Sequence, residues 1–164
     1  MIHIFQVPGD IRNYDEKTFI IEGKRTKSLL CSDALRKRPD VLERYFGETD
    51  GIELTFFIPE SLFSKDMLEI LNQKLGEFEY TVIPSLGEYS VGGRKVRYMG
   101  SVEAISTAIF LHLLKLRPEK LVIDVSTGFN IYRFHQGYPK KIFHVIDELI
   151  PFFRCLIIRV CIRI

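Results

Sequence analysis

The chain has little of the chemistry that marks secreted, metal-binding or membrane-spanning proteins. It contains no tryptophan and only three cysteines, and no two of them form a CxxC pair. Neither a disulfide framework nor a metal site is indicated, and reduced, mostly buried thiols in a cytoplasmic protein are expected. No apolar run reaches the ~20 residues that a bilayer-spanning helix needs, and the N-terminus lacks a signal-peptide pattern. We therefore predict no membrane segment, metal or cofactor.

Positive and negative charges nearly balance, because the formal net charge is only +2. A general electrostatic attraction to nucleic acid is not indicated, and no direct DNA binding is expected. Apolar residues make up 46% of the chain and charged residues 27%. This composition is typical of one folded domain rather than of a disordered chain.

Short apolar and β-branched runs alternate with stretches of helical spacing. Turn residues punctuate them, and the pair Gly92-Gly93 lies between two short segments, as in a β-hairpin. Gly23-Lys-Arg-Thr-Lys27 is interpreted as a basic turn. The predicted strands are 2–7, 18–22, 52–58, 79–83 and 120–125, and the predicted helices are 28–38 with Ser28 as its cap, 59–75, 101–116 and 141–149.

This alternation predicts an α/β fold. Strands connected by helices form right-handed crossovers, which give a mainly parallel sheet with helices on both faces. We predict a Rossmann-like, doubly wound domain over residues 1–150 with a β-hairpin insertion. Residues 151–164 are predicted to be an apolar tail spotted with arginines, a truncated or diverged remnant whose form as strand or helix stays open.

The segment Leu121-Val-Ile-Asp-Val-Ser-Thr-Gly-Phe-Asn-Ile-Tyr132 begins as a buried strand and ends in a compact polar cluster. In open α/β sheets, ligands bind at the carboxyl ends of the strands. Gly128 permits close backbone approach, Ser126 and Thr127 add hydroxyls, and Asn130 adds an amide, which together suit a phosphate or a nucleotide. The same residue types are also common in turns and helix caps, so both interpretations stay open.

The first predicted strand ends in a second polar loop, Pro8-Gly-Asp-Ile-Arg-Asn-Tyr14. Gly9 and Asn13 suit a tight turn, and Tyr14 could stack on a base. In a doubly wound fold this loop and the later one can share a crevice. The chain contains no GxGxxG, GxxxxGK[ST], GxSxG or HExxH motif, and we predict no catalytic residue.

Three segments in order resemble one family. Residues 117–132, 4–37 and 56–63 are similar to CRISPR-associated Rossmann-fold (CARF) domains, in particular to the sensor half of archaeal-type proteins in which this domain precedes a HEPN ribonuclease. The resemblance implies an antiviral defence protein that forms two-fold dimers and binds cyclic oligoadenylate, most often the four-membered ring. It implies as ligand-binding residues Gly9, Asp10, Asn13, Tyr14, Ser126, Thr127, Gly128 and Asn130.

The chain departs from that family after the polar turn. No Arg–His pair has the spacing of a HEPN site, and Gly137 and Pro139 interrupt the expected long helix. RNA cleavage is therefore not expected, and RNA would be involved only through an effector domain that this chain lacks. Two alternatives stay open: a slow ring nuclease, with Ser126, Thr127 and Lys24 as its suspected residues, and a non-catalytic dimerisation partner of a longer CARF protein.

Overall fold

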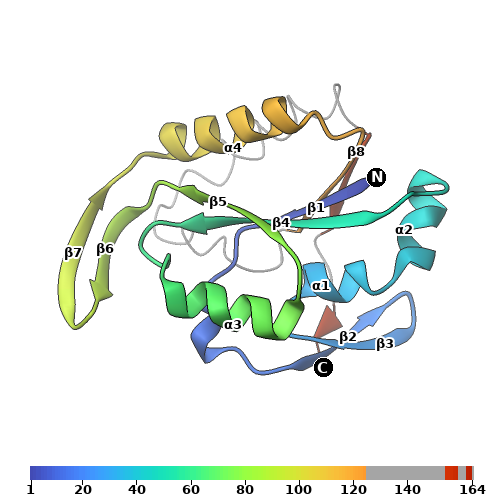
Figure 1. The fold of residues 1–164 in the computed structure, drawn as a ribbon, viewed down its shortest axis with the longest axis horizontal. Coiled ribbons are helices and arrows are strands. Elements are labelled where there is room, and N and C mark those ends of the chain that lie inside the picture. Colours follow the sequence, from blue (N-terminus) through green and yellow to red (C-terminus); the bar gives the residue numbers. More distant parts are fainter. Residues whose placement is uncertain (125–153, 159–161, 164) are drawn as a thin grey trace.

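The computed structural model describes residues 1–124, 154–158 and 162–163, with side chains described for residues 1–124 (Figure 1). The elements are β1 (Ile2–Gln6), η1 (Ile11–Asn13), β2 (Lys17–Ile21), β3 (Lys24–Ser28), α1 (Cys31–Arg36), α2 (Pro39–Phe46), β4 (Ile52–Pro59), α3 (Lys65–Leu75), β5 (Glu79–Ile83), β6 (Leu86–Val91), β7 (Arg94–Met99), α4 (Val102–Leu116), β8 (Lys120–Asp124), β9 (Arg154–Ile158) and β10 (Ile162–Arg163).

The centre of the molecule is a five-stranded sheet with the order β5-β4-β1-β8-β9. All of its pairings are parallel, and β1 lies between β4 and β8, with Ile4 opposite Leu54 on one side and Val122 on the other. Figure 1 shows α1 and α3 on one side of the sheet and α4 on the other. The predicted α/β, Rossmann-like fold with a mainly parallel sheet is therefore confirmed.

Alternate side chains of β1 point to opposite sides of the sheet, as the two-residue period of a strand requires. Ile2 and Ile4 pack in one core with α1, α2 and α3, whereas Phe5 and Val7 pack in a second core with α4. Both cores exclude water, since Ile2, Ile4 and Phe5 are at most 2% exposed. A strand covered on both sides must be apolar along its whole length, which is why these runs could be recognised as parallel strands.

His112 of α4 packs its ring against the second core. Its ring meets Phe57 edge-on at 5.3 Å and Phe5 at 6.1 Å, and its Nδ1 lies 2.9 Å from the hydroxyl of Thr81. Burial lowers the pKa of this imidazole, and the positive charge of Lys115 lowers it further. The native structure therefore holds His112 in its neutral form more strongly than the unfolded chain does.

We expect the free energy of unfolding to fall as the pH is lowered through about 6.5, the pKa of an unperturbed histidine. Below that pH the unfolded chain binds a proton at His112 before the folded chain does, so protonation favours unfolding. Urea titrations at pH 8 and pH 5.5 would measure the change. The variant His112→Asn should lose part of it, and an unchanged pH dependence in that variant would contradict the assignment.

One predicted turn is a strand. Residues 24–28 form β3, which pairs antiparallel with β2 so that Thr26 lies opposite Phe19, and the connection is Glu22-Gly23, both at positive φ. Charged side chains at 24, 25 and 27 suggested a solvated turn. Pairing with β2 decides the conformation instead, because β-propensity depends strongly on the neighbouring strand.

The predicted helix starts were wrong at two places. The residue at the N-cap of α1 is Leu30, because the Ser28 hydroxyl is hydrogen-bonded to Asp33 at 2.6 Å and Ser28 ends β3. The predicted helix from 59 begins only at Lys65, where the Ser64 hydroxyl accepts a hydrogen bond from the amide of Met67. α1 ends at Arg36, before Pro39 as predicted, but sequence reasoning missed α2. Pro39 starts that helix, as proline can at the first helical position.

Other predictions are confirmed or lie outside the described residues. The hairpin around Gly92-Gly93 is β6–β7, and α4 begins after Ser101, whose hydroxyl caps it. Part of the predicted tail forms strands: β9 pairs parallel with β8, and β10 pairs antiparallel with β2. The predicted helix over 141–149 lies outside the described residues, and the division of the chain at residue 150 stays a prediction.

The prediction of reduced thiols is wrong for Cys31. This side chain is 1% exposed at the start of α1 and is disulfide-bonded. Its partner is not among the side chains that the structure describes. Cysteine spacing in a sequence does not report distance in space, and here β10 returns to β2, so segments at opposite ends of the chain come together.

Candidate functional site at the ends of β1 and β8

The order of the strands reverses between β1 and β8. From β1 the chain continues to β4 and β5 on one side, and later places β8 and β9 on the other. Such a switch point opens a crevice at the carboxyl ends of the two strands, which is where ligands bind in open α/β sheets. Gln6 and Asp124 are the last residues of these strands and lie opposite each other in the register.

Both strand ends carry polar side chains that are shielded from water. Gln6 is 1% exposed and Asp124 is fully buried. The amide oxygen of Gln6 accepts a hydrogen bond from the hydroxyl of Ser32, which is itself fully buried in α1. Buried polar groups of this kind need partners, so this contact fixes the start of α1 against the end of β1.

The loop after β1 has a defined shape. Gly9 lies against the ring of Tyr14, and a side chain at position 9 would collide with the Tyr14 hydroxyl. Asp10 caps η1 by accepting from the amide of Arg12 at 3.3 Å, and its carboxylate pairs with the Arg12 Nε at 2.7 Å. Hydrogen bonding from Arg12 lowers the pKa of Asp10. The negative charge of Asp10 is thus already engaged within the loop.

The structure places the predicted site residues in different surroundings. Gly9 and Tyr14 are in contact, Asp10 is half-buried, and Asn13 is exposed at the end of η1. Because η1 contacts α3, this loop runs toward the α3 side of the sheet after it leaves β1. The predicted residues Ser126, Thr127, Gly128 and Asn130 lie outside the described residues.

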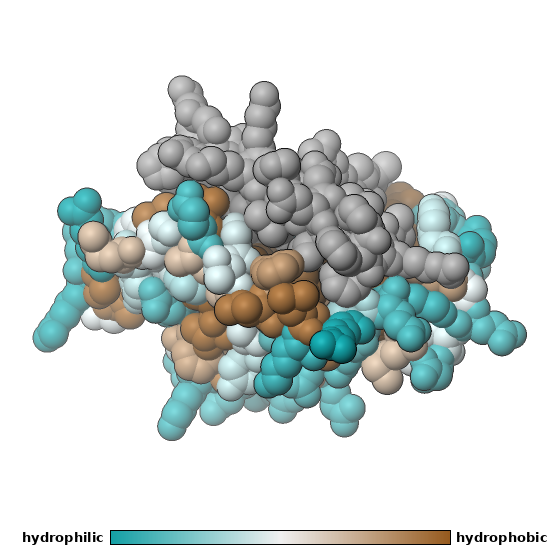
Figure 2. Space-filling view, turned by 90° about the horizontal axis from the view of Figure 1, so that it is seen from above, coloured by the Kyte–Doolittle hydropathy of each residue, from teal (hydrophilic) through white to brown (hydrophobic). Residues whose placement is uncertain are grey.

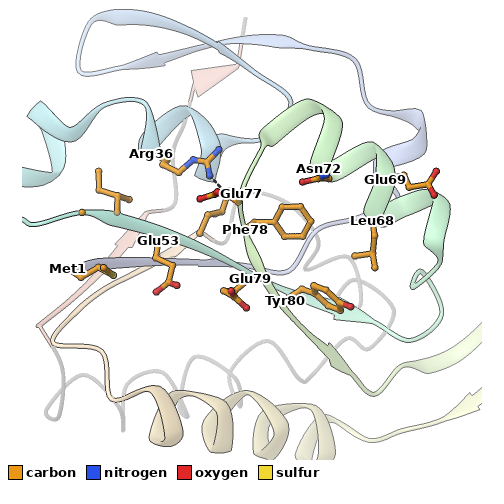
Figure 3. A pocket seen from close by; sticks show the side chains of 13 residues that line it. Met1, Arg36, Glu53, Leu68, Glu69, Asn72, Glu77, Phe78, Glu79 and Tyr80 are labelled. Carbon is orange, nitrogen blue, oxygen red and sulfur yellow. Dashed lines mark hydrogen bonds between the residues drawn. The ribbon is translucent and has the colours of Figure 1, made fainter.

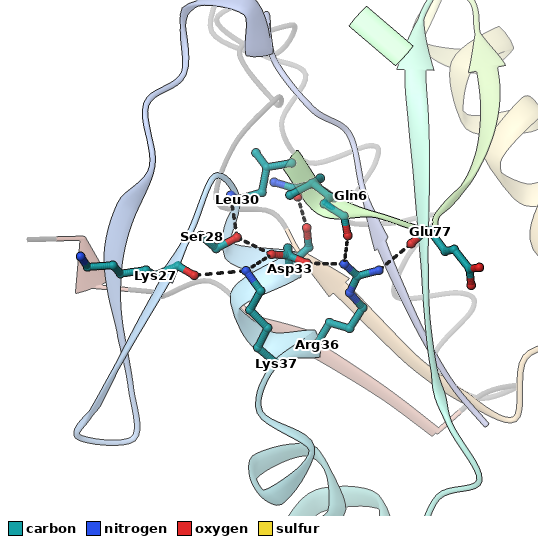
Figure 4. A network of polar contacts seen from close by, with 10 residues as sticks. Gln6, Lys27, Ser28, Leu30, Asp33, Arg36, Lys37 and Glu77 are labelled. Atoms are coloured by element: carbon teal, nitrogen blue, oxygen red, sulfur yellow. Dashed lines mark hydrogen bonds and ion pairs between the residues drawn. The ribbon is translucent and has the colours of Figure 1, made fainter. Parts of the chain in front are cut away.

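A polar network anchors α1 to its neighbours in the fold (Figure 4). Asp33 is fully buried and contacts the Ser28 hydroxyl at 2.6 Å, the Arg36 guanidinium at 2.5 Å and the Lys37 ammonium at 2.7 Å. Arg36 also donates to the carbonyl of Glu77 at 2.6 Å. The network therefore joins β3, α1 and the segment before β5.

Sequence reasoning missed Gln6, Ser32 and Asp33. One signal was present: Gln6 is a polar residue in an otherwise apolar strand, IHIFQV, and such a residue needs a buried partner. The identity of the partner could not be inferred, because Gln6 and Ser32 are 26 residues apart and only the packing of α1 on β1 brings them together.

A separate pocket of about 740 Å³ lies at the opposite end of the sheet, between the starts of β4 and β5 (Figure 3). Its lining contains the aromatic rings of Phe78 and Tyr80, one arginine and four carboxylates: Arg36, Glu53, Glu69, Glu77 and Glu79. Such a lining repels an anion. This pocket is therefore unsuited to a phosphate and is not part of the crevice.

The described residues offer neither a metal-binding cluster nor a membrane-spanning helix. No group of three or more His, Cys, Asp or Glu side chains there could hold a metal ion. Within the same residues, no helix is both long and apolar enough to cross a membrane.

A parallel sheet that reverses its order between β1 and β8, with polar residues at both strand ends, defines a Rossmann-like α/β domain. A family model described as "CRISPR system endoribonuclease Csx1, CARF domain" matches residues 3–134, and the chain belongs to this family. The match spans β1 to β8 and both polar loops, and it makes the chain a CRISPR-associated sensor domain. A search of curated proteins found no match.

Proposed function

We propose that this chain senses cyclic oligoadenylate, and that the ring, most often the four-membered one, binds across a two-fold interface between two copies of the chain. The observation that carries the proposal is the match to the CARF family over residues 3–134, a range that contains the residues of both polar loops. A ring with two-fold symmetry suits a two-fold site, to which each copy contributes one half.

The two polar loops supply the ligand contacts. In the first loop, Gly9 leaves room for the Tyr14 hydroxyl, and the Asn13 side chain is exposed to solvent. We assign the ligand to the residues of both loops: Gly9, Asp10, Asn13, Tyr14, Ser126, Thr127, Gly128 and Asn130. Hydroxyl, amide and backbone N–H groups can donate to phosphate and ribose oxygens. Asp124 carries the wrong charge for a phosphate contact, and we assign it no direct contact with the ligand.

The proposal also includes the location, oligomeric state and partners of the protein. It works in the cytoplasm as a homodimer, without direct binding to DNA or to a membrane, and without a cofactor. RNA becomes involved only through an effector domain, and a longer CARF protein could supply it. The net charge of +2 agrees with a protein that does not rely on general attraction to polyanions.

Isothermal titration of the purified chain with cyclic tetra-adenylate tests the proposal. We expect saturable heat at one ring for every two chains, and chromatography of the ligand afterwards should recover the ring intact. Loss of the ring would identify a ring nuclease instead of a sensor. If folded protein releases no heat with rings of three, four or six adenylates, the proposed function is wrong.

Replacing an amide in the first loop should weaken the binding. We expect Asn13→Ala to lower the affinity for cyclic tetra-adenylate about tenfold, the effect of losing roughly one hydrogen bond to a charged group. The matched control is Asn72→Ala, which removes another exposed asparagine, on α3, at the opposite pocket. Equal affinities of the two variants would show that Asn13 does not contact the ligand.

A further inference from the structure

The pocket between β4 and β5 opens where the two strands begin at different levels of the sheet (Figure 3). β4 starts at Ile52, but its pairing with β5 starts only at Thr55, which lies opposite Glu79. Within the described residues, no strand lies beside residues 52–54 on that side. An uncovered strand edge presents backbone N–H and C=O groups, so this part of β4 can offer carbonyl oxygens to a ligand.

The pocket keeps a negative charge that its one arginine does not balance. Arg36 pairs with the buried Asp33 at 2.5 Å and donates to the carbonyl of Glu77 at 2.6 Å, so its charge is already engaged within the fold. Glu53 lies 2.9 Å from the Nδ1 of His3. Within residues 1–124, the other carboxylates of the pocket form no ion pair: Glu69, Glu77 and Glu79. Such a lining attracts a cation.

The rings of Phe78 and Tyr80 favour an organic cation over a metal ion. Their centroids are 6.4 Å apart, and Tyr80 is 43% exposed. An aromatic face attracts an ammonium group and also covers methylene groups. Among the described residues, the carboxylates do not gather in a group that could hold a metal ion. Separated charges beside apolar walls suit a ligand whose own charges are separated along an apolar chain.

We propose that this pocket binds a linear polyamine, a chain of methylene groups that carries two or more ammonium groups. The ammonium groups pair with the carboxylates, and the methylene segments lie on Phe78 and Tyr80. The pocket volume of about 740 Å³ is within the usual range for small-molecule sites, roughly 300–1,000 Å³. The pocket lies at the starts of the strands and the crevice at their ends, so this inference does not depend on binding of cyclic oligoadenylate.

Residues 104–114 of α4 offer no comparable site, although this helix is also apolar and exposed. Figure 2, which views the molecule from the side of α4, shows hydrophobic surface gathered beside the grey atoms, and Leu111 is 58% exposed there. These eleven positions contain no Asp, Glu, Lys or Arg. An apolar surface without carboxylates does not select an ammonium group, so we expect a polyamine to bind at the pocket and not at α4.

Isothermal titration of the purified chain with spermidine, at low salt and without cyclic oligoadenylate, tests the proposal. We expect saturable binding that is about tenfold tighter than that of n-butylamine, which has one ammonium group. An equal concentration of Mg²⁺ should not displace the spermidine. The double variant Glu69→Gln, Glu79→Gln should bind it about tenfold more weakly. The matched control, Glu16→Gln with Glu43→Gln, removes the same charge at two exposed carboxylates outside the pocket and should bind as the wild type does.

Substitutions of Tyr80 test the aromatic contact separately from the charge. Tyr80→Phe keeps the ring and should bind spermidine as the wild type does, whereas Tyr80→Leu should bind it several-fold more weakly. Absence of saturable binding, displacement by Mg²⁺, equal losses in the two double variants, or wild-type affinity of Tyr80→Leu would overturn the proposal. Binding of a lysine-rich peptide without binding of spermidine would assign the pocket to a protein partner and would also overturn it.

Discussion

Replacing Asp33 with alanine is expected to lower the free energy of unfolding by about 3 kcal/mol, as for other broken buried ion pairs. The carboxylate is fully buried and accepts from Ser28, Arg36 and Lys37 at 2.5–2.7 Å. Removing it leaves a buried hydroxyl and two cations without their shared acceptor. The two cations can turn partly to water, which keeps the loss at the lower end of the usual range. Urea unfolding at pH 7 would measure the loss.

The matched control for this prediction is Asp40→Ala. Asp40 is also paired with an arginine, since the Arg38 Nε lies 2.7 Å from its carboxylate, but its side chain is 48% exposed. Water reaches the Asp40 carboxylate, and Arg38, although its side chain is only 10% exposed, keeps its hydrogen bond to the Ile21 carbonyl at 2.9 Å, so the stability should fall less. Comparable losses in the two variants would show that burial of Asp33 does not set its contribution.

Replacing Phe57 with alanine is expected to cost about 3–5 kcal/mol, the usual range for removing a buried aromatic ring. Phe57 is 3% exposed in β4, stacks on Phe5 at 5.3 Å and meets the ring of His112 at 5.3 Å. Its loss leaves a cavity between the sheet and α4 that rigid strands cannot close. Thermal and urea unfolding would both report the change.

Phe63→Ala is the control for this second prediction. Phe63 also contacts another ring, that of Tyr80 at 5.9 Å, but it is 42% exposed. Little apolar surface returns to water when it is removed, so the stability should change by less than about 1 kcal/mol. If Phe57→Leu, which keeps most of the volume, costs as much as Phe57→Ala, the cavity is not the cause of the loss.

Local patterns predicted the elements whose conformation depends on their own residues. β5 has the predicted bounds, Glu79–Ile83, and α4 starts after the predicted cap, Ser101. Continuous apolar runs predicted the parallel strands, because both sides of each strand had to be covered. The features that the sequence mispredicted depend on other segments. Residues 24–28 form β3 because they pair with β2, and Ser28 does not cap α1 because its hydroxyl is hydrogen-bonded to Asp33.

The candidate site divides in the same way. The sequence predicted that polar residues follow two strands, and the structure shows those strands to be adjacent, with Gln6 beside Asp124. It could not predict the contact between Gln6 and Ser32 or the three partners of Asp33. A side chain reveals its chemistry in a sequence, but its partner depends on how helices pack on the sheet.

The sequence by itself determined the fold class, the order of most elements and the family of this protein, since periodicity and turn chemistry are written in neighbouring residues. Only the tertiary structure decided which polar groups are buried at the strand ends, how α1 is anchored, and that a pocket opens between the starts of β4 and β5. The reason is physical: burial and hydrogen-bond pairing arise between segments far apart in the chain, and they are fixed only when the sheet and its helices come together.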